Sequence, residues 1–286
     1  MKMTVADKIK EAFTSLTRAE KQLANIMLES YPLSAMGTVV SLSEAAKVST
    51  PTAGRMARKL GFKGFPDMQR QIKSELGDTL SNPLEKHDRI VTSGDGHILS
   101  QFADAVMNNI LQTVSQIDTA DFDRVVESVS RTENTLYIVG GRITHSLAEY
   151  FYTHMQVIRP NVTLVEPNAN SWPHYVINMR PGDVLVVFDI RRYENDILTL
   201  AEIARSRNVE LILFTDQWGS PATKIAQHVF HSRIEVPSAW DSTVAVSFLL
   251  EALIEAVQST IWPDTRNRMK DLEALLDKAR LFRKFV

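Results

Sequence analysis

Apolar side chains in the first 80 residues recur every three or four positions, which is the spacing of one helix face. The first such face comprises Val5, Ile9, Ala12 and Phe13. Thr17 and Glu20 then form a capping-box pattern that opens a second helix. Ser49 is expected to cap a later helix with Pro51 in its first turn and Gly61 at its end. The pattern predicts an all-helical N-terminal domain over residues 1–78.

The pattern changes after residue 133, where short apolar runs alternate with helical segments. Five runs predict strands: Thr135–Val139, Val162–Val165, Val184–Phe188, Leu211–Thr215 and Val229–Val236. Helices are expected near 143–158, 171–179, 193–207, 220–226 and 240–261. Strands that alternate with helices pair in parallel through right-handed crossovers. Residues 98–263 are therefore predicted to form an α/β sandwich with a five-stranded parallel sheet, after a linker of residues 79–97 and before a C-terminal helix in 264–286.

The segment from Ser41 to Phe62 predicts two short helices joined by a tight turn. Its inward apolar residues are expected to be Leu42, Ala45, Ala46, Val48, Ala53, Met56, Ala57 and Leu60. Lys47 falls in the turn, where it either takes a left-handed conformation, at a cost of about 1 kcal/mol, or requires a turn of another shape. This arrangement is typical of helix-turn-helix proteins, which lay the second helix in the major groove of DNA.

The outward face of the second helix carries hydroxyl and basic side chains. N-terminal residues of a reading helix meet base edges, and basic residues further along favour phosphates. We assign this surface to Ser49 as the N-terminal cap, to Thr50, Thr52 and Arg55 for base reading, and to Arg58, Lys59 and Lys63 mostly for phosphate contacts. The alternative is a three-helix packing module with a solvated basic face.

The charge distribution supports a nucleic-acid partner for the N-terminal part. Residues 1–80 hold twelve Lys and Arg against eight Asp and Glu, a net +4, whereas the remainder holds twenty against twenty-six, a net −6. A basic head on an acidic body suits a nucleic-acid contact confined to the head. The chain has no cysteine, which excludes disulfides and thiolate metal sites, and we expect no metal or cofactor.

The longest apolar run, from Val244 to Ile261, is interrupted by Glu251 and Glu255. We therefore expect a buried or dimer-forming helix there and not a membrane span. The chain does not begin with a basic and then apolar signal sequence. A cytoplasmic protein without a membrane partner is the expectation.

Two motifs carry a resemblance to a known family. Leu16-Thr17-Arg18-Ala19-Glu20 is followed by Val48-Ser49 and then by the run Ala57-Arg58-Lys59-Leu60-Gly61-Phe62-Lys63-Gly64-Phe65-Pro66. The chain resembles the RpiR family of bacterial transcription regulators, in which this run follows the recognition helix. The resemblance implies a C-terminal sugar isomerase (SIS) domain that senses phosphosugars.

The expected ligand loops follow the strands of the sheet. Gly140, Gly141, Arg142 and Thr144 follow the first strand, where backbone N–H groups could cradle an anion. SIS domains carry a Ser-x-Ser-Gly-x-Thr phosphate loop after the third strand, and here the aligned stretch is Asp189-Ile190-Arg191-Arg192-Tyr193-Glu194. We expect Arg191 and Arg192 to clamp an anion and Asp189 to orient an arginine or accept a ligand hydroxyl. The alternative is that the arginines are solvated or pair with Glu194, Asp196 or a partner subunit.

Aromatic and acidic residues in later loops are further ligand candidates, each with an alternative role. Trp172, Trp218 and Trp240 could each stack on a ligand or fill a dimer interface. Asp241 could touch the ligand, although a helix cap is its more ordinary role, as it is for Asp216.

Three functions are compatible with these patterns. The leading hypothesis is a dimeric regulator, or a dimer of dimers, that binds a palindromic operator in double-stranded DNA and responds to a small anionic metabolite such as a phosphosugar or an organic acid. The second is a sugar-phosphate isomerase with an appended helical domain, although no residue stands in a catalytic pattern. The third is a DNA-binding protein whose C-terminal half only dimerises.

Overall fold

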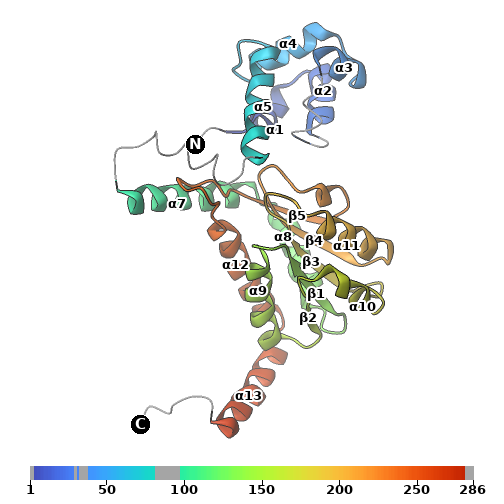
Figure 1. Cartoon of the computed structure of the whole chain (residues 1–286), viewed down its shortest axis with the longest axis vertical. Coiled ribbons are helices and arrows are strands. Elements are labelled where there is room, and N and C mark those ends of the chain that lie inside the picture. The colour runs from blue at the N-terminus through green and yellow to red at the C-terminus, as the bar shows by residue number, and fades with distance from the viewer. Residues whose placement is uncertain (1–2, 29–30, 32–37, 81–96, 281–286) are drawn as a thin grey trace. The chain divides into compact units, whose positions relative to one another are not determined.

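The computed structural model describes residues 3–28, 31, 38–80 and 97–280, without the side chains of 76–80 (Figure 1). The chain divides into two compact units, Met1–Ser93 and Gly94–Val286. The division falls inside the segment expected to be a linker.

The N-terminal unit is all-helical, as predicted. Its elements are α1 (Val5–Ala12), the short 3-10 helix η1 (Phe13–Ser15), α2 (Arg18–Leu28), α3 (Val39–Ala45), α4 (Thr50–Lys59) and α5 (Phe65–Leu80). The predicted capping box opens α2: the Thr17 N–H donates to Glu20 Oε2 at 2.8 Å, and the Glu20 N–H donates to Thr17 Oγ1 at 3.4 Å. Gly61 ends α4 with a φ of 86°, and the Phe62 N–H reaches back to the Ala57 carbonyl at 3.0 Å.

One hydrophobic core holds these helices together. Its fully buried members include Ile9, Leu23, Met27, Met56 and Ile72, one or more from each of the four helices α1, α2, α4 and α5. Residues expected to face this core do so, with one exception: Ala45 is exposed, and Ala46, one position on, is buried at 5% exposure. α5 also extends through residues 79 and 80, which we expected to be linker.

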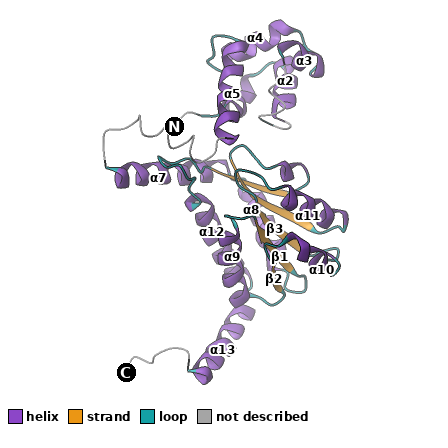
Figure 2. Cartoon of the chain, in the orientation of Figure 1, coloured by secondary structure: helices purple, strands orange, loops and turns teal. Residues whose placement is uncertain are grey.

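The C-terminal unit begins with α7 (Ile98–Gln116) and α8 (Thr119–Ser130) and then alternates strands with helices (Figure 2). The strands are β1 (Leu136–Gly140), β2 (Val162–Leu164), β3 (Val184–Phe188), β4 (Glu210–Asp216) and β5 (His228–Ser232). Between and after them lie α9 (His145–Ile158), η3 (Ala169–Ser171), α10 (Trp172–Val176), α11 (Asn195–Ser206), η4 (Pro221–Lys224), α12 (Val244–Thr260) and α13 (Trp262–Ala279). All strand pairs are parallel, as predicted, in the order β2-β1-β3-β4-β5.

Helices cover both faces of this sheet, which confirms the predicted sandwich (Figure 1). Alternate strand residues point to opposite faces. Leu136 and Ile138 join the core formed with α8, α9 and α12, whereas Tyr137 and Val139 join the core formed with α10 and α11. The strand order reverses beside β1, so the carboxyl ends of β1 and β3 flank the crevice in which open α/β sheets bind ligands.

Several bounds differ from the predictions, most clearly around the last strand. The last strand ends at Ser232 instead of Val236, residues 221–224 form a 3-10 helix, and α12 begins at Val244 instead of residue 240. Within the described residues, no single helix is long and apolar enough to cross a membrane; α12 and α13 meet the criterion only as a pair bent by 98°.

Candidate functional site

The predicted helix-turn-helix segment forms from α3, a tight turn and α4. Of the two alternatives for Lys47, the structure shows the left-handed conformation, with a φ of 53°. The turn closes through the Val48 N–H, which donates to the Ser43 carbonyl at 2.9 Å. Ser49 is the N-cap residue of α4, and Pro51 lies in the first turn, where its missing N–H leaves no hydrogen bond unmade.

The outward face of α4 is basic. Pro51, Arg55 and Arg58 are exposed at positions i, i+4 and i+7, so they share one side of the helix. Ser49 and Thr50 are exposed at its N-terminus. This exposed row has the composition and the placement that a reading helix requires.

Thr52, which we assigned to base reading, is buried at 4% exposure. Its hydroxyl accepts a hydrogen bond from Arg55 Nη2 at 3.2 Å and lies 3.0 Å from Ser49 Oγ. This geometry favours a positioning role, in which Thr52 orients Arg55 from inside the domain.

Lys59 is also engaged within the domain. Its Nζ lies 2.7 Å from Oε2 of Glu20, which is 2% exposed. Burial opposes ionisation of Glu20, but hydrogen bonds from Lys59 and Thr17 outweigh it and hold its pKa below the usual value. Lys59 therefore neutralises a buried carboxylate, which makes it a weaker phosphate-contact candidate than Arg58.

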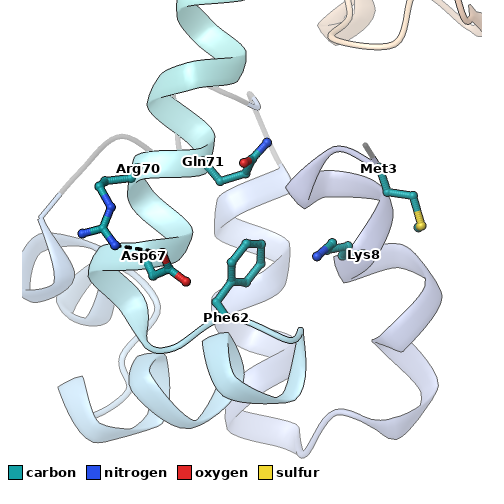
Figure 3. A pocket seen from close by; sticks show the side chains of 6 residues that line it. All are labelled: Met3, Lys8, Phe62, Asp67, Arg70 and Gln71. Carbon is teal, nitrogen blue, oxygen red and sulfur yellow. Dashed lines mark hydrogen bonds and ion pairs between the residues drawn. The ribbon is translucent and has the colours of Figure 1, made fainter. Parts of the chain in front are cut away.

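Lys63 is exposed. Its sequence neighbour Phe62 lines a hollow of about 390 Å³ (Figure 3). Lys8 lies over the Phe62 ring in this hollow, 4.4 Å from its centroid, and Arg70 pairs with Asp67 at 2.8 Å. The Lys63 backbone N–H donates to Asp67 Oδ2 at 3.0 Å, and the Lys63 side chain is exposed.

A second site lies at the carboxyl ends of β1 and β3. A Cβ on Gly140 would come within 2.5 Å of the Thr144 carbonyl oxygen, so only glycine fits there. The Gly141 N–H donates to Thr144 Oγ1 at 2.8 Å, and Thr144 Oγ1 donates to the Phe188 carbonyl at 2.8 Å. Thr144 therefore ties the loop after β1 to the end of β3.

The neighbouring amide of this loop already has a negatively charged partner. The Arg142 N–H donates to Glu194 Oε1 at 2.7 Å. Glu194 is the N-cap residue of α11, so this bond joins the loop after β1 to the loop after β3.

Asp216, at the end of β4, organises the loop after β3. This fully buried carboxylate accepts hydrogen bonds from the Arg191 N–H at 2.7 Å, Tyr193 Oη at 2.7 Å, the Trp218 N–H at 3.0 Å and the Gly219 N–H at 3.2 Å. Burial raises the pKa of Asp216, and it also raises the pKa of Tyr193, which faces this carboxylate.

Asp189 is buried beside this network at 3% exposure. It accepts hydrogen bonds from Ser220 Oγ and from the Glu194 N–H, the latter at 3.4 Å. Burial, together with the nearby charges of Asp216 and Glu194, raises the pKa of Asp189 to about 6 against the hydrogen bonds that lower it. Asp189 thus orients a serine and a backbone amide; no contact with an arginine is described.

The two loop arginines have different environments. Arg191 and Arg192 both adopt left-handed backbone conformations, with φ of 36° and 57°, and the Arg191–Asp216 hydrogen bond holds this strained segment. The Arg191 guanidinium pairs with Asp241, with Nε 3.2 Å from Oδ2, and lies 4.8 Å from the Trp218 ring centroid. Arg192 is exposed.

The structure therefore brings Arg191, Trp218 and Asp241 together. The ion pair between Arg191 and Asp241 was not among the alternatives that we considered for this arginine. The other two tryptophans have different surroundings. Trp172 lines an apolar groove of about 530 Å³ against α11, and Trp240 is 56% exposed.

Sequence reasoning missed four polar residues of this edge: Tyr193, Glu194, Asp216 and Ser220. Asp216 was visible as a carboxylate at the end of an apolar strand, yet we favoured a helix cap over ligand contact for it and did not foresee that it would organise the loop after β3. Glu194 was considered only as a partner of the arginines. A bond from its side chain to the Arg142 amide, 52 positions away, has no local sequence signal.

Two family profiles match the chain. A helix-turn-helix domain of the rpiR family matches residues 3–79, and a SIS domain matches residues 131–256. The protein is therefore a transcriptional regulator built from a helix-turn-helix domain and a SIS domain. It belongs to the RpiR family.

Individual relatives agree with this assignment. The HTH-type transcriptional regulator HexR of Escherichia coli is 21% identical over 232 residues, which span 78% of this chain and 76% of HexR. The Vibrio vulnificus NanR protein, solved in complex with ManNAc-6P, superposes with a TM-score of 0.57 at 17% identity and covers 98% of this chain and 99% of its own. The sugar isomerase domain of an RpiR transcription factor from Sphaerobacter thermophilus gives a TM-score of 0.59 at 18% identity over 63% of this chain and 99% of its own. At these identities the structures establish the fold.

Proposed function

We propose that this regulator binds a palindromic operator in double-stranded DNA through α4, acting in the cytoplasm, and that a small anionic metabolite at the edge of the parallel sheet modulates the binding. A phosphosugar, another carbohydrate derivative or an organic acid would belong to this class. The proposal is non-enzymatic, in line with relatives that are named as transcriptional regulators.

The exposed face of α4 is the observation that carries the proposal. Arg55 is oriented by Thr52 and can reach base edges, while Arg58 and Lys63 are exposed for phosphate contacts. The hydroxyls of Ser49 and Thr50 stand at the helix N-terminus, which is the part of a reading helix that lies deepest in the groove.

The loops at the carboxyl ends of β1 and β3 support the metabolite proposal. They lie where the strand order reverses, and they carry the exposed side chains of Arg142 and Arg192. The related NanR protein was solved with a phosphosugar, which makes that chemical class the first to test here.

Exposed apolar side chains support self-association. Met107, Leu111 and Val114 on α7 are 55%, 70% and 46% exposed, and their spacing places them on one helix face. A homodimer or a dimer of dimers would cover such a stripe and present two copies of α4 to two half-sites. Sedimentation of the full chain at micromolar concentration should give a dimer or a tetramer, and a monomer would contradict this part of the proposal.

A gel-shift titration against the DNA upstream of the chain's own gene tests the proposal. We expect selective retention of that DNA over scrambled DNA, with affinity that falls steeply as salt rises. Hexose phosphates and organic acids added one at a time should include at least one compound that changes the operator affinity. Equal and weak retention of every oligonucleotide would overturn the DNA-binding proposal. If none of the added compounds changed the operator affinity, the proposal of a regulatory metabolite would be overturned.

A further inference from the structure

The loop after β1 ends in an amide that a carboxylate of the chain itself occupies. Glu194 Oε1 accepts the Arg142 N–H at 2.7 Å. If Gly141 carried a Cβ, its three nearest atoms would all belong to the Glu194 carboxyl group, at 2.5, 2.9 and 3.3 Å. The carboxylate therefore lies directly against the glycine of this loop.

The surrounding charges make an additional anion unfavourable while Glu194 stays in place. Asp189 and Asp216 are buried beneath the same loops, and the nearby guanidinium of Arg191 is already paired with Asp241. Two like charges held close together repel each other. A ligand phosphate or carboxylate reaches the Arg142 amide at low cost only when the Glu194 carboxylate leaves.

Displacement of Glu194 requires little rearrangement of the fold. Glu194 is exposed, so its carboxylate can rotate into solvent and regain hydration. Its backbone N–H donates to Asp189 Oδ1 at 3.4 Å, an interaction that does not involve the side chain. The start of α11 can therefore stay in place while the side chain moves.

Two buried polar atoms at the same edge independently point to a ligand. His145 Nδ1, in the first residue of α9, and Trp218 Nε1 are buried and lack a hydrogen-bond partner within the described chain. The backbone N–H of His145 donates to the Gly141 carbonyl at 2.8 Å, which places this residue next to the loop that Glu194 covers. The Trp218 side chain is 5% exposed and lies against Arg191. Buried polar atoms are normally satisfied, so a bound molecule that moved the side chains around these two atoms would gain their hydrogen bonds.

We propose that Glu194 is a built-in competitor that occupies the anion position of the loop after β1 and that the anionic group of the metabolite binds by displacing it. This inference rests on the proposed function, because it assumes that the edge of the sheet is the metabolite site. It makes Glu194 a specificity-determining residue: an anion binds only when its contacts outweigh those of the carboxylate already present.

Calorimetric titration of the full chain with inorganic phosphate, without DNA, tests the competition. Glu194→Ala removes the competing carboxylate, and we expect phosphate affinity to rise about tenfold, the scale of one charge-assisted hydrogen bond at an exposed site. Glu194→Gln keeps a neutral acceptor for the Arg142 amide and should give a smaller gain. Asp196→Asn removes an exposed carboxylate from the first turn of the same helix and should change the affinity less than about twofold.

Three outcomes would overturn the inference. Phosphate could bind Glu194→Ala no more tightly than the wild type, including the case in which neither binds measurably. It could bind Asp196→Asn as tightly as Glu194→Ala, which would reduce the effect to general electrostatics. It could also bind Glu194→Gln more weakly than the wild type, which would make Glu194 part of the receptor. Each outcome is read without DNA, so it is separate from a failure of operator control.

A second variant reaches the same carboxylate from the other side. Gly141→Ala places a methyl group 2.5 Å from the position of Glu194 Oε1, which is also the position proposed for the anion, so it should expel the carboxylate and block phosphate as well. In the Glu194→Ala background the same substitution should abolish the gain in phosphate affinity. An undiminished gain in the double variant would show that the anion binds elsewhere. Unchanged circular dichroism and thermal transitions verify that each variant is folded.

Discussion

The outward face of α4 and the edge of the parallel sheet both gather charged residues, but they use them differently. On α4, Arg55 and Arg58 are exposed and no carboxylate is described as pairing with either. At the sheet edge, Arg191 is paired with Asp241 and the Arg142 amide with Glu194. The proposed DNA-binding face therefore presents two arginines that are not neutralised by carboxylates of the described chain. The proposed metabolite site is instead held in shape by internal pairs, which a ligand would have to replace.

The strongest way to break this comparison is to remove the carboxylate that organises the sheet edge. Asp216→Ala leaves three N–H donors and the Tyr193 hydroxyl without their acceptor inside a buried site. We expect a loss of about 3–5 kcal/mol in the free energy of unfolding of the C-terminal unit, the scale for removing one partner of a buried charged network. Scanning calorimetry measures this, and the exposed Asp196→Asn serves as the control. A loss below about 1 kcal/mol would show that water replaces the carboxylate.

The raised pKa of Asp189 sharpens the comparison through pH. Its pKa is about 6 in the folded protein, above the unfolded value, so the folded state binds the proton more tightly. Protonated Asp189 makes its full contribution to the free energy of unfolding below about pH 4. This contribution is lost as the pH rises through about 6. Subtracting the pH profile of Asp189→Asn from that of the wild type should reveal a decline of about 2–3 kcal/mol between pH 4 and 7. A flat difference profile in urea denaturation would contradict the buried, partly neutral carboxyl group.

Arg55→Ala tests the reading surface directly. We expect a loss of about 1–3 kcal/mol in operator affinity with a smaller loss for scrambled DNA, because a base contact carries sequence preference. Fluorescence anisotropy with both DNAs measures the two losses. Lys10→Ala removes a positive charge from the exposed side of α1 and is the control. Equal losses on both DNAs would move Arg55 to the phosphate class.

Substitutions of two neighbouring basic residues of α4 should have different effects, both smaller than those above. Arg58→Ala should lower the salt dependence of operator binding by about one phosphate contact and leave stability unchanged. Lys59→Ala should leave the salt dependence nearly intact and destabilise the N-terminal unit by about 1 kcal/mol, because Glu20 loses its partner. Salt titrations and thermal melts of both variants check this, and identical behaviour would refute the separate role of Lys59.

The sequence predicted most of the fold because its signals are local. Capping residues such as Thr17 and Gly61, and strands apolar on both faces such as Val184–Phe188, are determined by neighbours along the chain. The fold class and the domain order followed from these signals, and the family profiles confirmed the resemblance.

The candidate sites were less predictable because they depend on distant pairs. Nothing near Lys59 reveals that Glu20, 39 positions away, is buried beneath it. Similarly, Arg191 meets Asp241 across 50 positions, because the fold brings the loop after β3 next to the segment before α12. The sequence indicated which residue types gather at each site, and the tertiary fold decides which of them are already paired.

The close approach of Gly141 to the Glu194 carboxylate has an evolutionary consequence. A side chain at position 141 and a carboxylate at position 194 exclude each other sterically. Homologous chains should therefore change the two positions together: where evolution introduces a larger residue at the first, it should shorten or neutralise the second. The residues at these two positions would then indicate, from sequences alone, which members of the family carry a competing carboxylate at the proposed anion position.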